Sequence, residues 1–137
     1  MRFIDTNFFL RYLTRDEEEK AYAVLELLKR IERNEEKVIT SPLVMFELVF
    51  TLQSFYNCTR EEIRDLVLPL ISLRGLKLPF KKIFERALID FPEKQISFAD
   101  IFNYHFMIEH GIREIYSFDR DFDKFKDISR ITLSEKS

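Results

Sequence analysis

The sequence predicts an α/β fold, a three-layer sandwich in which helices cover both faces of a central, mostly parallel sheet. Short runs of strand-forming residues alternate with longer segments of helical periodicity along the 137 residues. Parallel strands need a crossover connection, usually a helix, so this alternation favours a parallel sheet. The length is close to that of one domain, and neither a linker nor an internal repeat divides it. We therefore expect residues 1–137 to form a single domain.

Local patterns predict the elements of the N-terminal half. Residues 2–5 have the composition of a buried strand that enters a turn at the following Thr-Asn pair. Residues 17–33 place apolar side chains at helical spacing and predict an amphipathic helix. Residues 37–40 predict a second strand, which stops at Ser41 before a proline. A serine cap followed by proline in the first turn indicates a helix over about residues 43–56.

The C-terminal half continues the alternation. Thr59 begins a helix with a capping-box pattern. A short strand at residues 76–78 precedes a helix near residues 80–90, and another helix begins at residues 97–100 and fades at Gly111. The two remaining strands are predicted over residues 114–117 and 128–133.

Composition excludes several classes of function. With 22 basic and 24 acidic side chains the net charge is −2, so a polyanionic substrate would need a local basic patch or a bound metal. Gly75 and Gly111 lie too far apart for a glycine-rich nucleotide loop, and the single cysteine, Cys58, cannot form an internal disulfide. We find no apolar run long enough to span a membrane and no export signal, and we therefore expect a cytoplasmic protein.

Three acidic residues stand alone in apolar segments. They are Asp5 in residues 3–10, Glu47 in residues 38–59 and Asp100 in residues 95–108, with His105 counted as neutral. The second segment holds 22 residues, in which the overall charged fraction of 34% predicts about seven charges. Because an unpaired, desolvated acid costs several kcal/mol, we expect these acids to be paired. Each lies near the end of a predicted strand or the start of the next helix, where open parallel sheets form their ligand-binding sites. Asp119, just after the predicted strand at residues 114–117, is a fourth candidate.

Carboxylates grouped at one place need a compensating charge. Two of them about 4 Å apart repel by about 4 kcal/mol at an effective dielectric constant near 20. A bound divalent cation relieves this repulsion, and oxygen ligands without His or Cys favour magnesium or manganese over zinc. Two such ions can activate water and stabilise the leaving oxygen in phosphodiester cleavage. Asp121 and Asp123 are expected to face solvent, although either can add a ligand.

Each acid also has a purely structural interpretation. Asp5 can cap the helix that follows it, and Asp100, three residues after Ser97, can belong to a capping box. Glu47 lies too deep in its helix to cap it and can instead be the buried partner of an arginine. Asp119 lies among other charged residues and can be a solvated loop charge.

Four segments of the chain resemble one protein family. Residues 4–13, Ile-Asp-Thr-Asn-Phe-Phe-Leu-Arg-Tyr-Leu, resemble the opening of a PIN domain, whose first strand ends in an acid within an Asp-Thr-Asn-type motif. The Ser-Pro turn leading to Glu47 resembles the family's second acidic position, and residues 98–101, Phe-Ala-Asp-Ile, resemble the third. Residues 117–122, Ser-Phe-Asp-Arg-Asp-Phe, resemble the Thr/Ser-x-Asp-x-Asp-Phe segment near the end of the domain. The match covers essentially the whole chain, in order and at normal spacing.

In size the chain is most similar to the single-domain VapC-type toxins of toxin–antitoxin pairs. This resemblance implies a magnesium- or manganese-dependent endoribonuclease that cleaves RNA, forms a homodimer and is inhibited by a small antitoxin protein. It also implies metal-binding acids that carry the catalysis and neighbours that orient them. The acids are Asp5, Glu47, Asp100 and Asp119, and the neighbours are Thr6, Asn7 and Ser117.

Other functions fit parts of the same pattern. A catalytically degenerate domain of this fold can serve as a protein-binding module, and a housekeeping RNA-processing nuclease would carry the same acids. A magnesium phosphatase of the haloacid-dehalogenase type also begins with a strand ending in an acid, but its second acid would fall at Asn7. A phospho-receiver domain would need paired leading acids and a late lysine, which we do not find. We therefore favour the nuclease.

Overall fold

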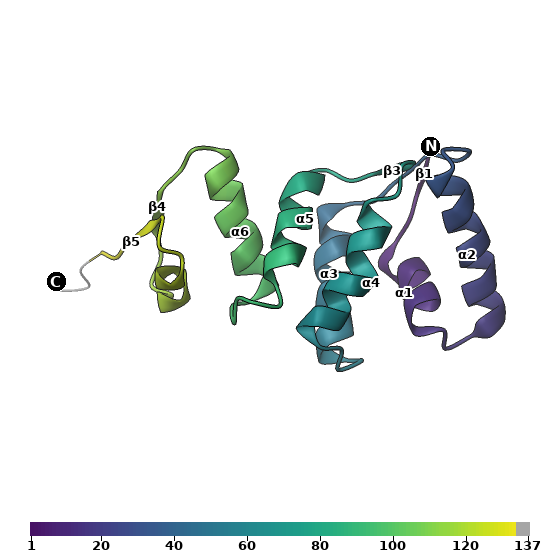
Figure 1. Ribbon diagram of the computed structural model, residues 1–137, viewed down its shortest axis with the longest axis horizontal. Helices are drawn as coiled ribbons and strands as arrows, with labels where there is room; N and C mark the ends of the chain where they lie inside the picture. Colours follow the sequence, from purple (N-terminus) through teal and green to yellow (C-terminus); the bar gives the residue numbers. More distant parts are fainter. Residues whose placement is uncertain (134–137) are drawn as a thin grey trace.

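The computed structural model describes residues 1–133 and has the predicted α/β class (Figure 1). The first half contains β1 (Arg2–Phe3), α1 (Thr6–Thr14), α2 (Glu18–Glu32), β2 (Val38–Ile39), α3 (Pro42–Ser54) and α4 (Arg60–Ile71). The second half contains β3 (Leu76–Lys77), α5 (Lys81–Asp90), α6 (Phe98–Glu109), β4 (Glu114–Tyr116), the 3₁₀-helix η1 (Arg120–Lys124) and β5 (Ser129–Ile131). No helix in the described part of the chain is long and apolar enough to cross a membrane.

The strands pair in parallel, as predicted, but they form two sheets where the sequence led us to expect one. One sheet has the order β1-β2-β3, and the other contains β4 and β5. Thr40, a buried polar residue, ties the ends of β1 and β2 together by donating its hydroxyl to the Ile4 carbonyl oxygen at 2.7 Å. Figure 1 shows the two sheets at opposite ends of the molecule, with α3 to α6 between them.

Aromatic contacts join α6 to the elements on either side of it. The Phe102 ring of α6 packs against Phe84 of α5, with ring centroids 4.7 Å apart. Tyr104, also on α6, stacks on Phe125 at 3.9 Å and donates its hydroxyl to Asp127 at 2.7 Å. The helix therefore contacts the main body through one set of rings and holds the β4–β5 segment through another.

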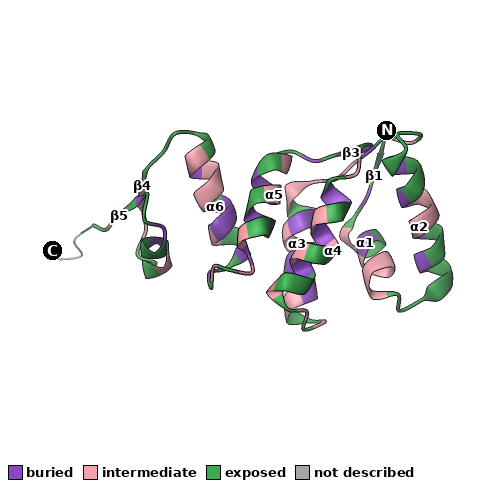
Figure 2. Cartoon of the chain, viewed as in Figure 1, coloured by how far each residue is buried: buried purple, intermediate pink, exposed green. Residues whose placement is uncertain are grey.

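The hydrophobic core is richest in α3, α4 and α5, where most purple ribbon appears in Figure 2. The caps of these helices follow the predicted chemistry. Ser41 accepts a hydrogen bond from the Val44 amide and precedes proline at the first helical position of α3. Thr59 and Glu62 form the predicted capping box at the start of α4.

Two expectations for the N-terminus are wrong. The segment after β1, expected to be a turn, is the nine-residue helix α1, because the Asp5 carboxylate caps it by accepting the Phe8 amide at 3.0 Å. The β1 strand was expected to be buried, but Phe3 is 57% exposed. β1 is an edge strand, and the structure places no further strand beside it within residues 1–133.

Candidate metal centre

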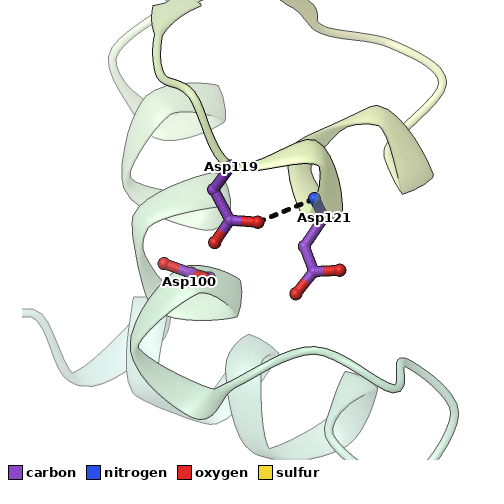
Figure 3. Close-up of side chains that lie close together, drawn as sticks. All are labelled: Asp100, Asp119 and Asp121. Atoms are coloured by element: carbon purple, nitrogen blue, oxygen red, sulfur yellow. Dashed lines mark hydrogen bonds between the residues drawn. The ribbon is translucent and has the colours of Figure 1, made fainter.

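Three aspartates from two separated segments meet at one place. Asp100 lies in the first turn of α6, whereas Asp119 and Asp121 lie at the start of η1, shortly after β4. Each offers a carboxylate oxygen, and these oxygens lie within 4.8 Å of one another. Figure 3 shows the three side chains around a common space between α6 and η1.

Short-range hydrogen bonds hold the backbone of this site in place. Ser97 caps α6 by accepting the Asp100 amide at 3.2 Å, which fixes the turn that carries this carboxylate. Ser117 accepts the Asp119 amide at 3.0 Å through its hydroxyl. Asp119 in turn accepts the Asp121 amide at 2.9 Å and caps η1 (Figure 3). One carboxylate oxygen of Asp119 thus accepts a backbone hydrogen bond within η1, whereas the other oxygen does not.

Like charges crowd Asp100 in particular. Burial raises the pKa of the Asp100 carboxyl, the negative charges of Asp119 and Asp121 raise it further, and the hydrogen bond with Ser97 partly opposes them. Both upward effects disfavour the ionised carboxylate. A cation placed among the three carboxylates would reverse this preference, because it stabilises the charged form.

Two basic residues flank the cluster. Lys124 lies 3.2 Å from the Asp121 carboxylate, one turn along η1. Arg130 of β5 binds Asp123 at 3.0 Å, and this hydrogen bond lowers the pKa of the Asp123 carboxyl. Asp123 is therefore engaged by an arginine, whereas Asp121, which was also expected to face solvent, belongs to the cluster and is half-buried. The sequence did not single out Lys124 or Arg130, because their contacts with Asp121 and Asp123 form only once η1 has folded.

The cluster does not include Asp5 or Glu47. Asp5 precedes α1, near the three-stranded sheet, and Figure 1 shows that end of the molecule far from β4. Asp5 and Asn7 line a cavity of about 410 Å³, to which the cations Arg11 and Lys20 contribute. Thr6 lies between these two residues in the first turn of α1.

Glu47 lies on an exposed face of α3 between two exposed apolar side chains, Leu43 and Phe50. Within residues 1–133 no lysine or arginine forms an ion pair with it, so the arginine-bound interpretation does not apply. The charge-free segment around Glu47 predicts burial, but the Glu47 side chain is exposed. The prediction of burial is correct for the opposite face of α3, which lies in the core.

The geometry defines what the cluster can do. Three aspartates offer only oxygen ligands, the set that magnesium and manganese prefer, and the described part of the chain adds no His or Cys to the group. The cluster opens toward solvent, because Asp119 is exposed and the other two are half-buried. It can therefore hold a divalent cation within reach of a large substrate.

Comparisons with known proteins identify the family of this chain. The PIN domain family model matches residues 2–128. The chain is 28% identical over 124 residues to a VapC ribonuclease of Aquifex aeolicus (strain VF5), which covers 90% of this chain and 91% of the relative. A solved structure, the sarcin–ricin loop cleaving toxin VapC20 of Mycobacterium tuberculosis, matches with 22% identity and a TM-score of 0.38, over 93% of this chain and 97% of that one. Because the family model spans almost the entire sequence, the chain belongs to the PIN domain family.

Proposed function

We propose that this protein is a metal-dependent endoribonuclease of the VapC type, which hydrolyses phosphodiester bonds in RNA and acts as the toxin of a toxin–antitoxin pair. The observation that carries the proposal is the convergence of Asp100, Asp119 and Asp121 from α6 and η1, with oxygens within 4.8 Å, in a PIN domain chain. The VapC ribonuclease of Aquifex aeolicus supports the choice of RNA as substrate.

The donor set fits magnesium or manganese. When bound, a divalent ion of this kind supplies Lewis acidity and makes a coordinated water a stronger nucleophile. The chain's own groups hold the ligands in position: Ser97 fixes the turn of Asp100, and Ser117 fixes the turn of Asp119. Lys124 balances part of the negative charge at Asp121 and lies where it can also contact a phosphate.

We assign the remaining site residues by the same reasoning. Asp5 and Glu47 complete the set of metal-binding and catalytic acids, and Thr6 and Asn7 support Asp5 from the first turn of α1. Both acids are exposed and thus accessible to a ligand.

The proposal includes the setting of the enzyme. We infer one PIN domain over residues 1–137, located in the cytoplasm, that forms a homodimer and is inhibited by a small antitoxin protein. The similarity to a VapC ribonuclease along 90% of the chain supports the comparison with a toxin of this size.

Cleavage of a mixed RNA pool by the purified protein tests the proposal. Reactions contain magnesium, manganese or a chelator, and the wild type is compared with Asp100→Asn and with the matched control Asp65→Asn, an exposed acid of α4. We expect metal-dependent cleavage that Asp100→Asn reduces more than about 100-fold, since even changes in residues behind metal ligands cost about 10- to 100-fold. Equal cleavage by Asp100→Asn and the wild type would refute the site.

One observation favours the second candidate, a protein-binding module without catalysis. Asp121 and Asp123 already have basic partners, Lys124 and Arg130, which can replace a metal as the source of positive charge. A folded protein that neither cleaves RNA nor binds manganese would establish this alternative.

A further inference from the structure

The connection between β3 and α5 concentrates positive charge in a chain that is slightly acidic overall. Residues 66–84 contain four basic side chains, Arg74, Lys77, Lys81 and Lys82, and none of the chain's 24 acids. The overall frequency of acids among the 137 residues predicts about three in a segment of this length. A polyanion approaching the protein would therefore meet little repulsion here.

The structure gathers three of these four cations. Arg74 precedes β3 and forms an ion pair with an acid of α2, whereas Lys77 ends β3 and Lys81 and Lys82 begin α5. Lys81 donates to a main-chain carbonyl oxygen of β3 at 2.6 Å, which folds the connection back and brings its two ends together (Figure 1, between β3 and α5). Within residues 1–133 none of the three lysines forms an ion pair with a carboxylate.

Stability alone does not explain the residues at the start of α5. The first turn of a helix favours Asp or Glu over cations, yet this turn contains two lysines and no acid. Phe80, just before the helix, has a φ of 62°, a conformation that is costly for a bulky side chain. Backbone strain of this kind is concentrated at binding sites, and a bound anion would offset the crowding of positive charge.

Phe80 adds an aromatic surface among the cations. Its side chain is 49% exposed. Phe102 and Phe106 of α6 hold the ring through T-shaped contacts, with centroids 6.2 Å and 5.8 Å from that of Phe80. The exposed part of the ring is therefore a rigid surface on which a base can stack. Cations beside an exposed aromatic ring are the combination that binds single-stranded nucleic acid, because the cations contact phosphates and the ring stacks with bases.

We propose that Lys77, Phe80, Lys81 and Lys82, the β3–α5 patch, bind a single-stranded segment of the RNA substrate away from the bond that is cleaved. Lys77 and Lys82, both exposed, contact phosphates, and one base stacks on Phe80. Lys81, which is half-buried, keeps the connection folded through its hydrogen bond to β3. This inference rests on the proposed function and adds a second substrate contact to it.

The β3–α5 patch lies within reach of an RNA strand bound at the metal centre. α6 connects the two places, because its first turn carries Asp100 and its later turns carry Phe106, on which Phe80 packs. Six residues separate Asp100 from Phe106, which corresponds to about 9 Å along the helix axis. A short RNA segment can therefore contact the acids and the patch at the same time.

Fluorescence anisotropy of a labelled, mixed-sequence single-stranded RNA, measured in chelator at several salt concentrations, tests the patch without cleavage. Each phosphate contact on a single strand contributes about 0.7 to the slope of log K against log salt concentration. We expect Lys77→Ala/Lys82→Ala to reduce the slope by about 1.4 and to weaken binding about 25-fold at about 0.1 M salt. Phe80→Leu should weaken binding about 5-fold or more with an unchanged slope, because it removes a stacked base but no charge. The matched control is Lys37→Ala, an exposed lysine at the amino end of β2, which should leave binding unchanged.

Cleavage assays separate the patch from the proposed function. With magnesium, the double lysine variant should raise KM for RNA and leave kcat unchanged, because the patch binds the substrate and the transition state equally. Phe80→Tyr keeps the ring and should bind RNA like the wild type. If the wild type cleaves RNA but the double lysine variant binds it as Lys37→Ala does, the patch is overturned and the nuclease stands. If the wild type binds RNA through the patch but does not cleave it, the patch stands and the nuclease is refuted.

A competitor distinguishes RNA from an acidic protein segment as the ligand of the patch. Polyglutamate at the same concentration of negative charge offers the lysines their electrostatic partners but gives Phe80 no base to stack on. We expect it to displace the labelled RNA only weakly. Displacement equal to that by unlabelled RNA would overturn the proposal and assign the patch to an acidic protein.

Discussion

Arg60 makes the most concentrated set of polar contacts in the described structure and offers a quantitative test. Its Nε atom donates to the Phe91 carbonyl oxygen and its Nη2 atom to the Lys94 carbonyl oxygen, both at 2.7 Å. The same Nη2 atom contacts the Ile96 carbonyl, and the guanidinium lies 3.8 Å from the centre of the Phe91 ring. One side chain of α4 thus holds the loop that leads into Ser97 and α6.

The magnitude follows from these contacts. Hydrogen bonds from a charged group contribute about 1.5–3 kcal/mol each, and a cation over an aromatic ring contributes about 0.5–2 kcal/mol. Arg60 is half-buried, and burial lowers its pKa, so desolvation offsets part of the sum and water can replace some contacts. We expect Arg60→Met to lower the free energy of unfolding by about 3 kcal/mol. For a chain of this size, that loss lowers Tm by about 10 °C.

Thermal and urea unfolding measure this loss directly. Arg64→Met is the matched control on the same helix, because Arg64, half-buried like Arg60, forms its ion pair with the exposed side chain of its neighbour Asp65. Surface pairs of this kind contribute about 0–1 kcal/mol, and we expect Tm to change by no more than about 3 °C. If Arg60→Met costs less than about 1 kcal/mol, or no more than Arg64→Met, the loop is held by other contacts and the reasoning is wrong.

Three further changes test other parts of the structure. Gly75→Ala should lower the free energy of unfolding, measured with urea, by about 3 kcal/mol, because the new Cβ would collide with two backbone carbonyl oxygens of the α2–β2 segment. Gly111→Ala should lower it by only about 1 kcal/mol, because Gly111 has φ +68° but faces open space. Burial, followed by the hydrogen bond to Asp127, raises the pKa of Tyr104 to about 12. Phenolate absorbance should therefore show a tyrosine that ionises near pH 12 and is absent in Tyr104→Phe. The stability linked to the Tyr104 proton should be lost as the pH rises from about 10 to about 12. Because the pKa of Asp100 is raised, the stability linked to its proton in the absence of metal is present below pH 3.8, the usual pKa, and is lost as the pH rises. Asp100→Asn should therefore raise Tm at neutral pH in chelator but not in acid. Manganese should raise Tm of the wild type but not of Asp100→Asn.

The sequence predicted local features well because their causes are local. The serine and threonine caps at Ser41, Thr59 and Ser97 occur where spacing alone placed them. Strand ends and isolated acids identified Asp100 and Asp119 as partners, and the structure brings their carboxylates together. These inferences depend on periodicity and chain direction, which a single sequence contains.

The remaining features depend on long-range packing. Whether β1 is a central or an edge strand determines whether Phe3 is buried, and nothing in residues 2–5 specifies which strand lies beside them. The ring contacts of Phe102 and Tyr104 likewise join residues that are distant in the sequence, and no local pattern predicts them. The sequence predicts Asp121 only as an additional ligand, because the surrounding charges are typical of a solvated loop, whereas in the structure the η1 turn brings its carboxylate within 4.8 Å of those of Asp100 and Asp119.

The central claim is that Asp100, Asp119 and Asp121 form a divalent-metal site. Crystals grown with manganese, measured at a wavelength where manganese scatters anomalously, test it most directly. We predict an anomalous peak bounded by these three carboxylates and the loss of that peak in Asp100→Asn crystals. A peak elsewhere, or an unaltered ion pair between Lys124 and Asp121 with no manganese among the three acids at saturating concentration, would contradict the account.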